Sequence, residues 1–117
     1  MNYYFVYGTL KEGKANSRVL EGAKKIKDFT TAPKFTMFSL GAFPGVINGG
    51  DTAIKGEIYE VTDKEQEERL DRLEGYKKGR DNNLYNKETI DIEDGKKAFI
   101  YIFNGRATNK LITNGVW

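Results

Sequence analysis

The feature that most constrains the fold is a predicted β-hairpin in the last third of the chain. The segments "NKETIDIE" and "KKAFIYIF" flank the Asp-Gly dipeptide at 94–95, which is the strongest two-residue signal for a hairpin. Such a turn would pair Glu93 with Lys96 and Ile90 with Phe99. A chain with this hairpin is expected to build a largely antiparallel sheet.

The rest of the chain combines extended segments with two predicted helices. A short helix is expected near 16–22. A second helix begins at Thr62, where Thr62 and Glu65 form an S/T-x-x-E capping box, and it ends at Gly75. The 117 residues are expected to form one domain of the α+β class, 1–117, with the sheet closed toward a barrel and two helices against it. The other strands are expected at about 2–7, on both sides of Pro33, within 43–49 and over 53–62.

The composition excludes several kinds of site. The chain has no cysteine and no histidine, so it can form no Cys/His zinc site, cysteine nucleophile or Ser–His–Asp triad. The net charge is only +2 with both signs interspersed, so no nucleic-acid partner is expected, and the basic stretch 76–87 is interpreted as a solvated loop. No signal peptide or membrane span is predicted. We therefore expect a cytoplasmic protein without membrane association, with a monomer as the default.

The stretch "YGTLKEGKAN" has the spacing of a nucleotide-binding P-loop, with Gly8, Gly13 and Lys14 in place. Ala15 stands where that motif needs the hydroxyl that holds magnesium, so nucleotide hydrolysis is not expected. Two interpretations stay open. The turn after the first strand could present backbone N–H groups to an anion such as a carboxylate, or its glycines could merely turn the chain.

A carboxyl group at the end of the second helix is expected to face inward. In "LDRLEGY", Leu70, Leu73 and Glu74 lie on one helical face, so packing of the leucines against the core carries Glu74 inward. Desolvation and the helix dipole would both raise its pKa, which suits an acid–base catalyst. Alternatively, Glu74 bends out to solvent or pairs with Lys77. The other charged residues of this helix are assigned to its exposed face: Glu65, Glu67, Glu68, Asp71 and Arg72.

Several motifs together resemble one family. The segments "FVYGTLKEGKANSRVL", "FSLGAFPGVI", "IKGEIYEV", "LDRLEGY", "LYNKETI" and "LITNGVW" look like the gamma-glutamylcyclotransferase-like proteins. That family includes the gamma-glutamylamine cyclotransferases and the AIG2-like proteins. The resemblance implies a small, mostly antiparallel (mixed) β-barrel with two helices.

The resemblance also implies roles for particular residues. The family's YG[ST]L loop binds the α-carboxylate and amine end of a gamma-glutamyl substrate, its single catalytic glutamate corresponds to Glu74, and the "FPG" turn at 43–45 matches a cavity wall. We add Tyr85 to the substrate site, because its hydroxyl, or that of Tyr101, could support a developing oxyanion. The loop residues are Tyr7, Gly8, Thr9 and Leu10.

The activity implied by the resemblance is intramolecular aminolysis. The α-amine of a gamma-glutamyl group attacks its own γ-carbonyl, which closes 5-oxoproline and releases an amine or amino acid. Such an enzyme, with one glutamate as acid and base, is expected to need no cofactor and no metal, because the substrate supplies the nucleophile. The alternative is a non-catalytic module of the same fold that binds a small, amino-acid-like ligand.

Overall fold

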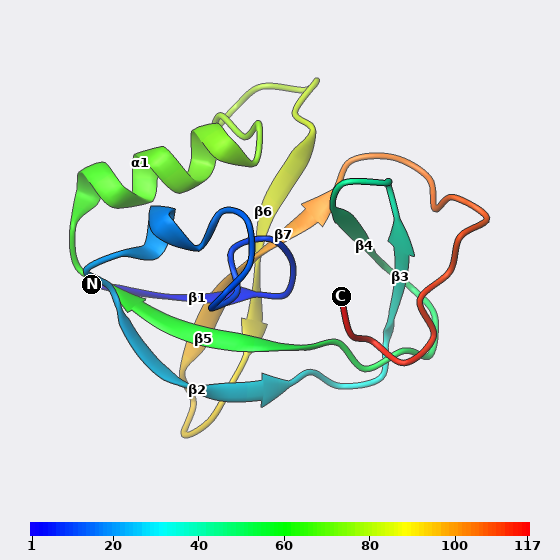
Figure 1. The fold of residues 1–117 in the computed structure, drawn as a ribbon, viewed down its shortest axis with the longest axis horizontal. Coiled ribbons are helices and arrows are strands. Elements are labelled where there is room, and N and C mark those ends of the chain that lie inside the picture. The colour runs from blue at the N-terminus through cyan, green and yellow to red at the C-terminus, as the bar shows by residue number, and fades with distance from the viewer.

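The computed structural model describes all 117 residues, and Figure 1 shows how its elements are arranged. There is one α-helix, α1 (Lys64–Leu73), and one short 3₁₀ helix at Ser17–Leu20. With ten residues, α1 lacks the length and the apolar character of a membrane-crossing helix. The strands are β1 (Asn2–Val6), β2 (Lys24–Thr30), β3 (Phe35–Ser39), β4 (Pro44–Asn48), β5 (Lys55–Val61), β6 (Tyr85–Asp91) and β7 (Lys97–Phe103).

Five strands form one mixed sheet, and the other two form a second sheet. The larger sheet has the order β2-β5-β1-β7-β6, in which β1 and β7 are parallel and every other neighbouring pair is antiparallel. β3 and β4 form a separate antiparallel pair at one end of it (Figure 1). Phe38 of β3 packs edge-on against Phe103 of β7, with ring centroids 5.6 Å apart. The expected mixed, mostly antiparallel α+β fold is therefore confirmed, and at this seam the two sheets meet through side chains.

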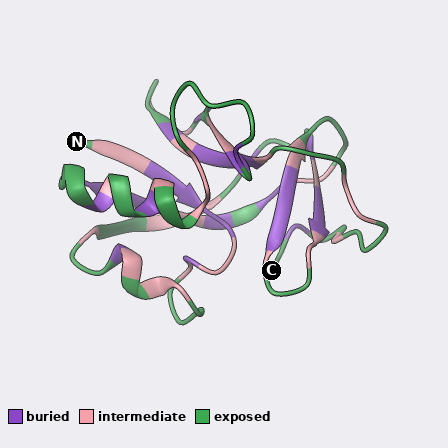
Figure 2. Ribbon diagram, turned by 90° about the horizontal axis from the view of Figure 1, so that it is seen from above, coloured by how far each residue is buried: buried purple, intermediate pink, exposed green.

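The larger sheet is buried on both faces at its centre, whereas most of α1 is exposed (Figure 2). Successive residues of β1 point to opposite sides, so Phe5 belongs to one core cluster and Tyr4 and Val6 belong to another. The second cluster includes Leu70 of α1, which is fully buried. This packing fixes the last turn of α1 on the sheet and thereby places Glu74, which caps the helix.

The helices differ from the prediction at their starts and in number. α1 is capped by Asp63, whose carboxylate accepts a hydrogen bond from the Glu65 N–H at 2.9 Å, so the capping box expected at Thr62 is wrong by one residue. The helix expected near 16–22 is only a four-residue 3₁₀ helix. Asn16 precedes it without capping it, because its side-chain amide donates to Thr9 Oγ1 at 2.8 Å.

The predicted hairpin at 94–95 forms, with a register one residue away from the expected one. Both turn residues have positive φ, 56° and 73°, as a tight hairpin requires. Residue 96 bonds through its N–H to the carbonyl of residue 93 and through its carbonyl to the N–H of residue 92. Residues 92 and 93 therefore both lie opposite residue 96, which is a bulge. Beyond the bulge, Ile90 pairs with Ala98 in place of the expected residue 99.

Candidate active site

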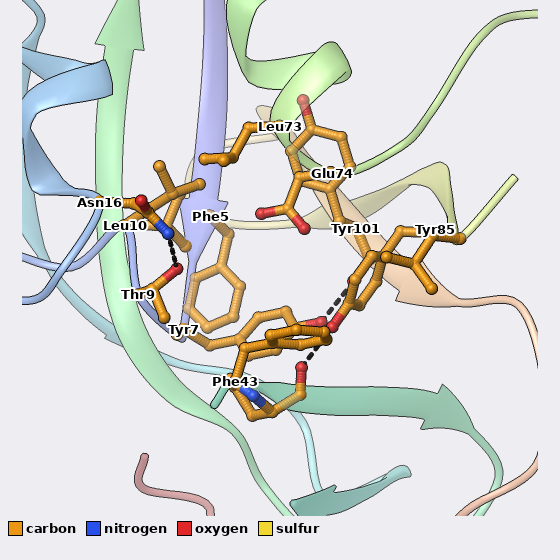
Figure 3. Close-up of a pocket in the computed structure, with 14 residues that line it drawn as sticks. Phe5, Tyr7, Thr9, Leu10, Asn16, Phe43, Leu73, Glu74, Tyr85 and Tyr101 are labelled. Atoms are coloured by element: carbon orange, nitrogen blue, oxygen red, sulfur yellow. Dashed lines mark hydrogen bonds between the residues drawn. The ribbon is translucent and has the colours of Figure 1, made fainter. Parts of the chain in front are cut away.

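A cavity of about 240 Å³ lies where the end of β1 and the loop after it meet the end of α1 (Figure 3). This volume is below the roughly 300–1,000 Å³ of pockets for drug-sized ligands and suits a ligand as small as an amino acid derivative. The structure thus brings a glycine turn and a helix end, far apart in the sequence, to one small space. All six residues predicted for the site line this cavity: Tyr7, Gly8, Thr9, Leu10, Glu74 and Tyr85.

Glu74 is the C-cap residue of α1, and its carboxyl group points into the cavity (Figure 3). Gly75 follows with a φ of +65°, a left-handed conformation that ends the helix. Neither Lys77 nor any other group forms an ion pair or hydrogen bond with the Glu74 carboxyl, and burial raises its pKa from 4.5 to about 7. Leu70 is buried as predicted, but Leu73 is 40% exposed and lines the cavity instead of the core.

The loop after β1 leaves three backbone N–H groups without an acceptor in the protein. These are the N–H groups of Gly8, Thr9 and Leu10, all of which line the cavity. Other bonds hold the loop in place: the Lys11 N–H donates to the Gly8 carbonyl at 3.1 Å, and Asn16 donates to Thr9 through its backbone N–H and its side-chain amide, both at 2.8 Å. Consecutive free N–H groups in a fixed turn are an anion-binding arrangement.

Gly8 is required by a close approach of another strand. A Cβ atom at this position would lie 2.9 Å from both Cγ and Cδ of Pro44, the first residue of β4. Pro44 and Phe43 belong to the "FPG" turn that was expected to form a cavity wall, and both line the cavity. The missing side chain at Gly8 therefore lets β4 close one side of the cavity.

Three tyrosine rings line the cavity, and each hydroxyl group is bound to the protein. Tyr7 donates to the carbonyl of Tyr101 at 2.6 Å, Tyr85 to the carbonyl of Pro44 at 2.5 Å, and Tyr101 to the carboxylate of Asp71 at 2.7 Å. Burial is the main cause that raises the pKa of all three hydroxyls. The hydroxyl protons of Tyr85 and Tyr101 are thus already donated within the protein, so these residues present their rings to a ligand.

Two further acids of α1 face the sheet, although both were assigned to the exposed face of the helix. Glu67 accepts a hydrogen bond from the Tyr4 hydroxyl at 2.8 Å. Asp71 accepts one from Tyr101 and pairs with Lys87, whose Nζ lies 3.1 Å from Asp71 Oδ1. The prediction was wrong because these partners lie on β1, β6 and β7, and no pattern within the helix reveals them. Together with the C-cap residue, the two acids form an inward-facing row in which only the last carboxyl is unpartnered.

Comparison with known proteins establishes the family. The family described as "Gamma-glutamyl cyclotransferase, AIG2-like" matches residues 4–117. The chain belongs to this family. A Vibrio cholerae protein that is provisionally named a gamma-glutamylcyclotransferase is 34% identical over 114 residues, which cover 97% of this chain and 92% of that protein.

Two solved structures agree with the AIG2-like assignment. The uncharacterized protein PH0828 from Pyrococcus horikoshii superposes with a TM-score of 0.82 at 27% identity, covering 99% of this chain and 89% of that one. An AIG2-like protein from Mus musculus superposes with a TM-score of 0.77 at 26% identity, covering 100% of this chain and 88% of the mouse chain. The expected family and fold are both confirmed.

The cavity of this AIG2-like chain also contains residues that the sequence prediction did not name. Asn16 and Leu73 line it, and only their place in the fold reveals this. Glu74 is the only charged residue in the lining, and no group of three or more acidic side chains in the structure is arranged to bind a metal ion. The arrangement can therefore bind an anion at the loop and exchange a proton at one carboxyl.

Proposed function

We propose that this AIG2-like protein is a gamma-glutamyl cyclotransferase. It would convert a gamma-glutamylamine or gamma-glutamyl peptide into 5-oxoproline and a free amine or amino acid. One observation carries the proposal: an unpartnered, half-buried carboxyl group shares a small cavity with three backbone N–H groups that have no acceptor. The first suits proton transfer and the second suits the α-carboxylate of an amino acid.

The loop residues would hold the substrate in a reactive shape. The free N–H groups of Gly8, Thr9 and Leu10 bind the α-carboxylate, and Asn16 keeps the loop fixed through its two bonds to Thr9. With that end anchored, the small cavity favours a curled glutamyl chain in which the α-nitrogen approaches the γ-carbonyl carbon. Holding two reacting groups together in this way can lower a barrier by about 7–11 kcal/mol in favourable cases.

Glu74 would carry the protons. The α-nitrogen attacks the γ-carbonyl carbon, a new C–N bond closes the five-membered ring, and the C–N bond to the leaving amine breaks. Two protons move overall from the α-ammonium to the departing nitrogen, and Glu74 relays them in sequence and returns to its starting state. A carboxyl with a pKa of about 7 can both accept and return a proton near neutral pH.

The proposed reaction needs no group beyond this chain and its substrate. The substrate supplies its own nucleophile, so the proposed reaction uses no cofactor, and a monomer is the proposed working unit. Tyr7 and Tyr85 contribute their rings to the cavity wall, where their hydroxyl groups are fixed by the carbonyls of Tyr101 and Pro44.

The proposal is tested by incubating the protein with gamma-glutamyl amides and gamma-glutamyl dipeptides and measuring 5-oxoproline by mass spectrometry. Time-dependent release of 5-oxoproline together with an equal amount of free amine supports it. If calorimetry detects binding of the same compounds but no product forms, the protein is instead a binding module of the same fold. The absence of both product and binding would overturn the proposed site as well.

A further inference from the structure

We propose that the leaving group of the substrate is an uncharged, apolar amine, and that Leu73 and Leu84 contact it at the mouth of the cavity. This inference rests on the proposed function and names the substrate class within it. Both leucines line the cavity, and they are 40% and 45% exposed, respectively. A side chain that lines a cavity and is also reached by solvent lies at its opening, so these leucines form an apolar part of its border.

The two leucines are placed on either side of the acid that would protonate the leaving group. Leu73 directly precedes Glu74 in the last turn of α1. Leu84 packs against the residue that follows, because a Cβ atom on Gly75 would lie 2.9 Å from the Cβ of Leu84. The Leu84 N–H also donates to the Gly75 carbonyl at 3.1 Å. The nitrogen that leaves must lie close to the Glu74 carboxyl, so the chain attached to it passes between these leucines.

The charges around the opening disfavour a leaving group with a second ammonium. Glu74 is the only charged residue in the lining, and a cation bound to it would occupy the group that the reaction needs. Asp71 is already paired with Lys87 and hydrogen-bonded by Tyr101.

The exposure of Leu73 and Leu84 at the cavity is explained by contact with a ligand. Most large apolar side chains of the chain are covered, whereas these two leucines line a cavity, and ligand cavities are lined mainly by apolar side chains. A backbone hydrogen bond and a close packing contact fix Leu84 in its place, so an apolar chain meets a preformed surface. The chemical class that fits is a gamma-glutamyl amide of an aliphatic or aromatic amine.

The test compares two substrates of equal length, gamma-glutamyl-n-pentylamide and gamma-glutamylputrescine, in which an ammonium replaces the terminal methyl group. We expect kcat/KM for 5-oxoproline release to be at least about tenfold higher for the pentylamide. Gamma-glutamylputrescine loses the apolar contact of the terminal methyl group, and its terminal ammonium must be desolvated. Equal values, or a preference for gamma-glutamylputrescine, would overturn the inference and leave the proposed function intact. Product from gamma-glutamyl dipeptides alone would also overturn the inference only, whereas no 5-oxoproline from these two amides or from the dipeptides would overturn both.

A matched pair of variants locates the effect. Leu84→Glu should reduce kcat/KM for the pentylamide and raise it for gamma-glutamylputrescine, changing their ratio by about tenfold or more. Leu111→Glu is the control, because Leu111 is 57% exposed and lies outside the cavity lining. In this variant the ratio of the two kcat/KM values should stay at the wild-type value. A ratio that changes equally in both variants contradicts a contact at Leu84. If Leu84→Glu fails to fold, the wild-type comparison of the two substrates still decides the inference.

Discussion

Asp71, in the last turn of α1, and Glu74, its C-cap residue, lie three residues apart with both carboxyl groups facing inward, yet only Asp71 has partners in the protein. Asp71 accepts the Tyr101 hydroxyl at 2.7 Å and pairs with Lys87 at 3.1 Å, whereas Glu74 points into the cavity with no partner. Glu67, nearer the start of the helix, is bound by the Tyr4 hydroxyl in the same way as Asp71. Two acids of the helix therefore hold it on the sheet, and the third has no partner in the protein.

Removal of the carboxylate should lower the stability of the folded protein at Asp71 and raise it at Glu74. Asp71→Ala leaves the largely buried Lys87 ammonium and the Tyr101 hydroxyl without their acceptor, so we expect the free energy of unfolding to fall by about 2 kcal/mol. Urea denaturation at neutral pH measures this change.

Asp91→Ala is the matched control for that variant. Asp91 also pairs with a lysine, Lys97, at 2.6 Å, but on the fully exposed surface, where an ion pair contributes little to stability. A loss of stability as large for Asp91→Ala as for Asp71→Ala would show that burial of the Asp71 pair has no special importance.

Glu74 should make the protein less stable as pH rises. Its pKa is raised from 4.5 to about 7 by burial, so the folded protein binds more protons than the unfolded chain between these values, and stability falls with rising pH across that range. A shift of this size corresponds to about 3 kcal/mol. The chain has no histidine, so no other side chain ordinarily titrates between pH 5 and 8.

Glu74→Gln should remove this dependence. Its thermal midpoint is expected to match that of the wild type near pH 4 and to exceed it at pH 8, because the wild type alone has to bury a charge there. Scanning calorimetry at both pH values gives the comparison. Parallel stability curves for the two proteins would mean that the Glu74 carboxyl is not desolvated in the folded state.

Gly8→Ala should damage the cavity through Pro44. The new Cβ would lie 2.9 Å from two atoms of the proline ring, so β4 must shift, which costs about 1–3 kcal/mol and should raise KM. Pro44→Ala removes those two ring atoms, so the double variant should recover part of the loss. Strictly additive effects on stability in a double-mutant cycle would contradict a contact between these residues.

The proposed catalytic role of Glu74 also predicts a pH–rate profile. Glu74 must be ionised to accept the first proton, so kcat/KM should rise with pH, with a midpoint near its pKa of about 7. The rate of 5-oxoproline release from a gamma-glutamyl amide between pH 5 and 8.5 measures it. A flat profile across that range would assign the proton transfers to solvent.

Much of the site could be predicted because it depends on local signals. The helical spacing of Leu70 and Glu74 allowed an inward carboxyl and the glycine turn after the first strand allowed free backbone donors, and the family resemblance favoured both over a solvent-facing acid and a simple turn. Both conclusions depend on geometry within a few residues, and the structure places both features at the cavity.

The features that were missed depend on distant partners. Asp71 has the sequence environment of an exposed helix residue, and only the packing of β6 and β7 brings Lys87 and Tyr101 to it. The hairpin register depends on a bulge, which the Asp-Gly signal does not encode. Leu73 follows the apolar spacing of the helix, which predicted that it packs in the core. It lies where the cavity opens, so its side chain is partly exposed to solvent.

The most direct test of the central claim is the rate of 5-oxoproline release by the wild type and by Glu74→Gln, measured at pH 8 with the substrate that the wild type turns over best. The variant keeps the shape of the side chain and is expected to be folded and at least as stable as the wild type at this pH. We predict a rate at least about 100-fold lower than that of the wild type, with binding of the substrate retained. A folded Glu74→Gln protein whose rate stays within a few-fold of the wild type would contradict the account.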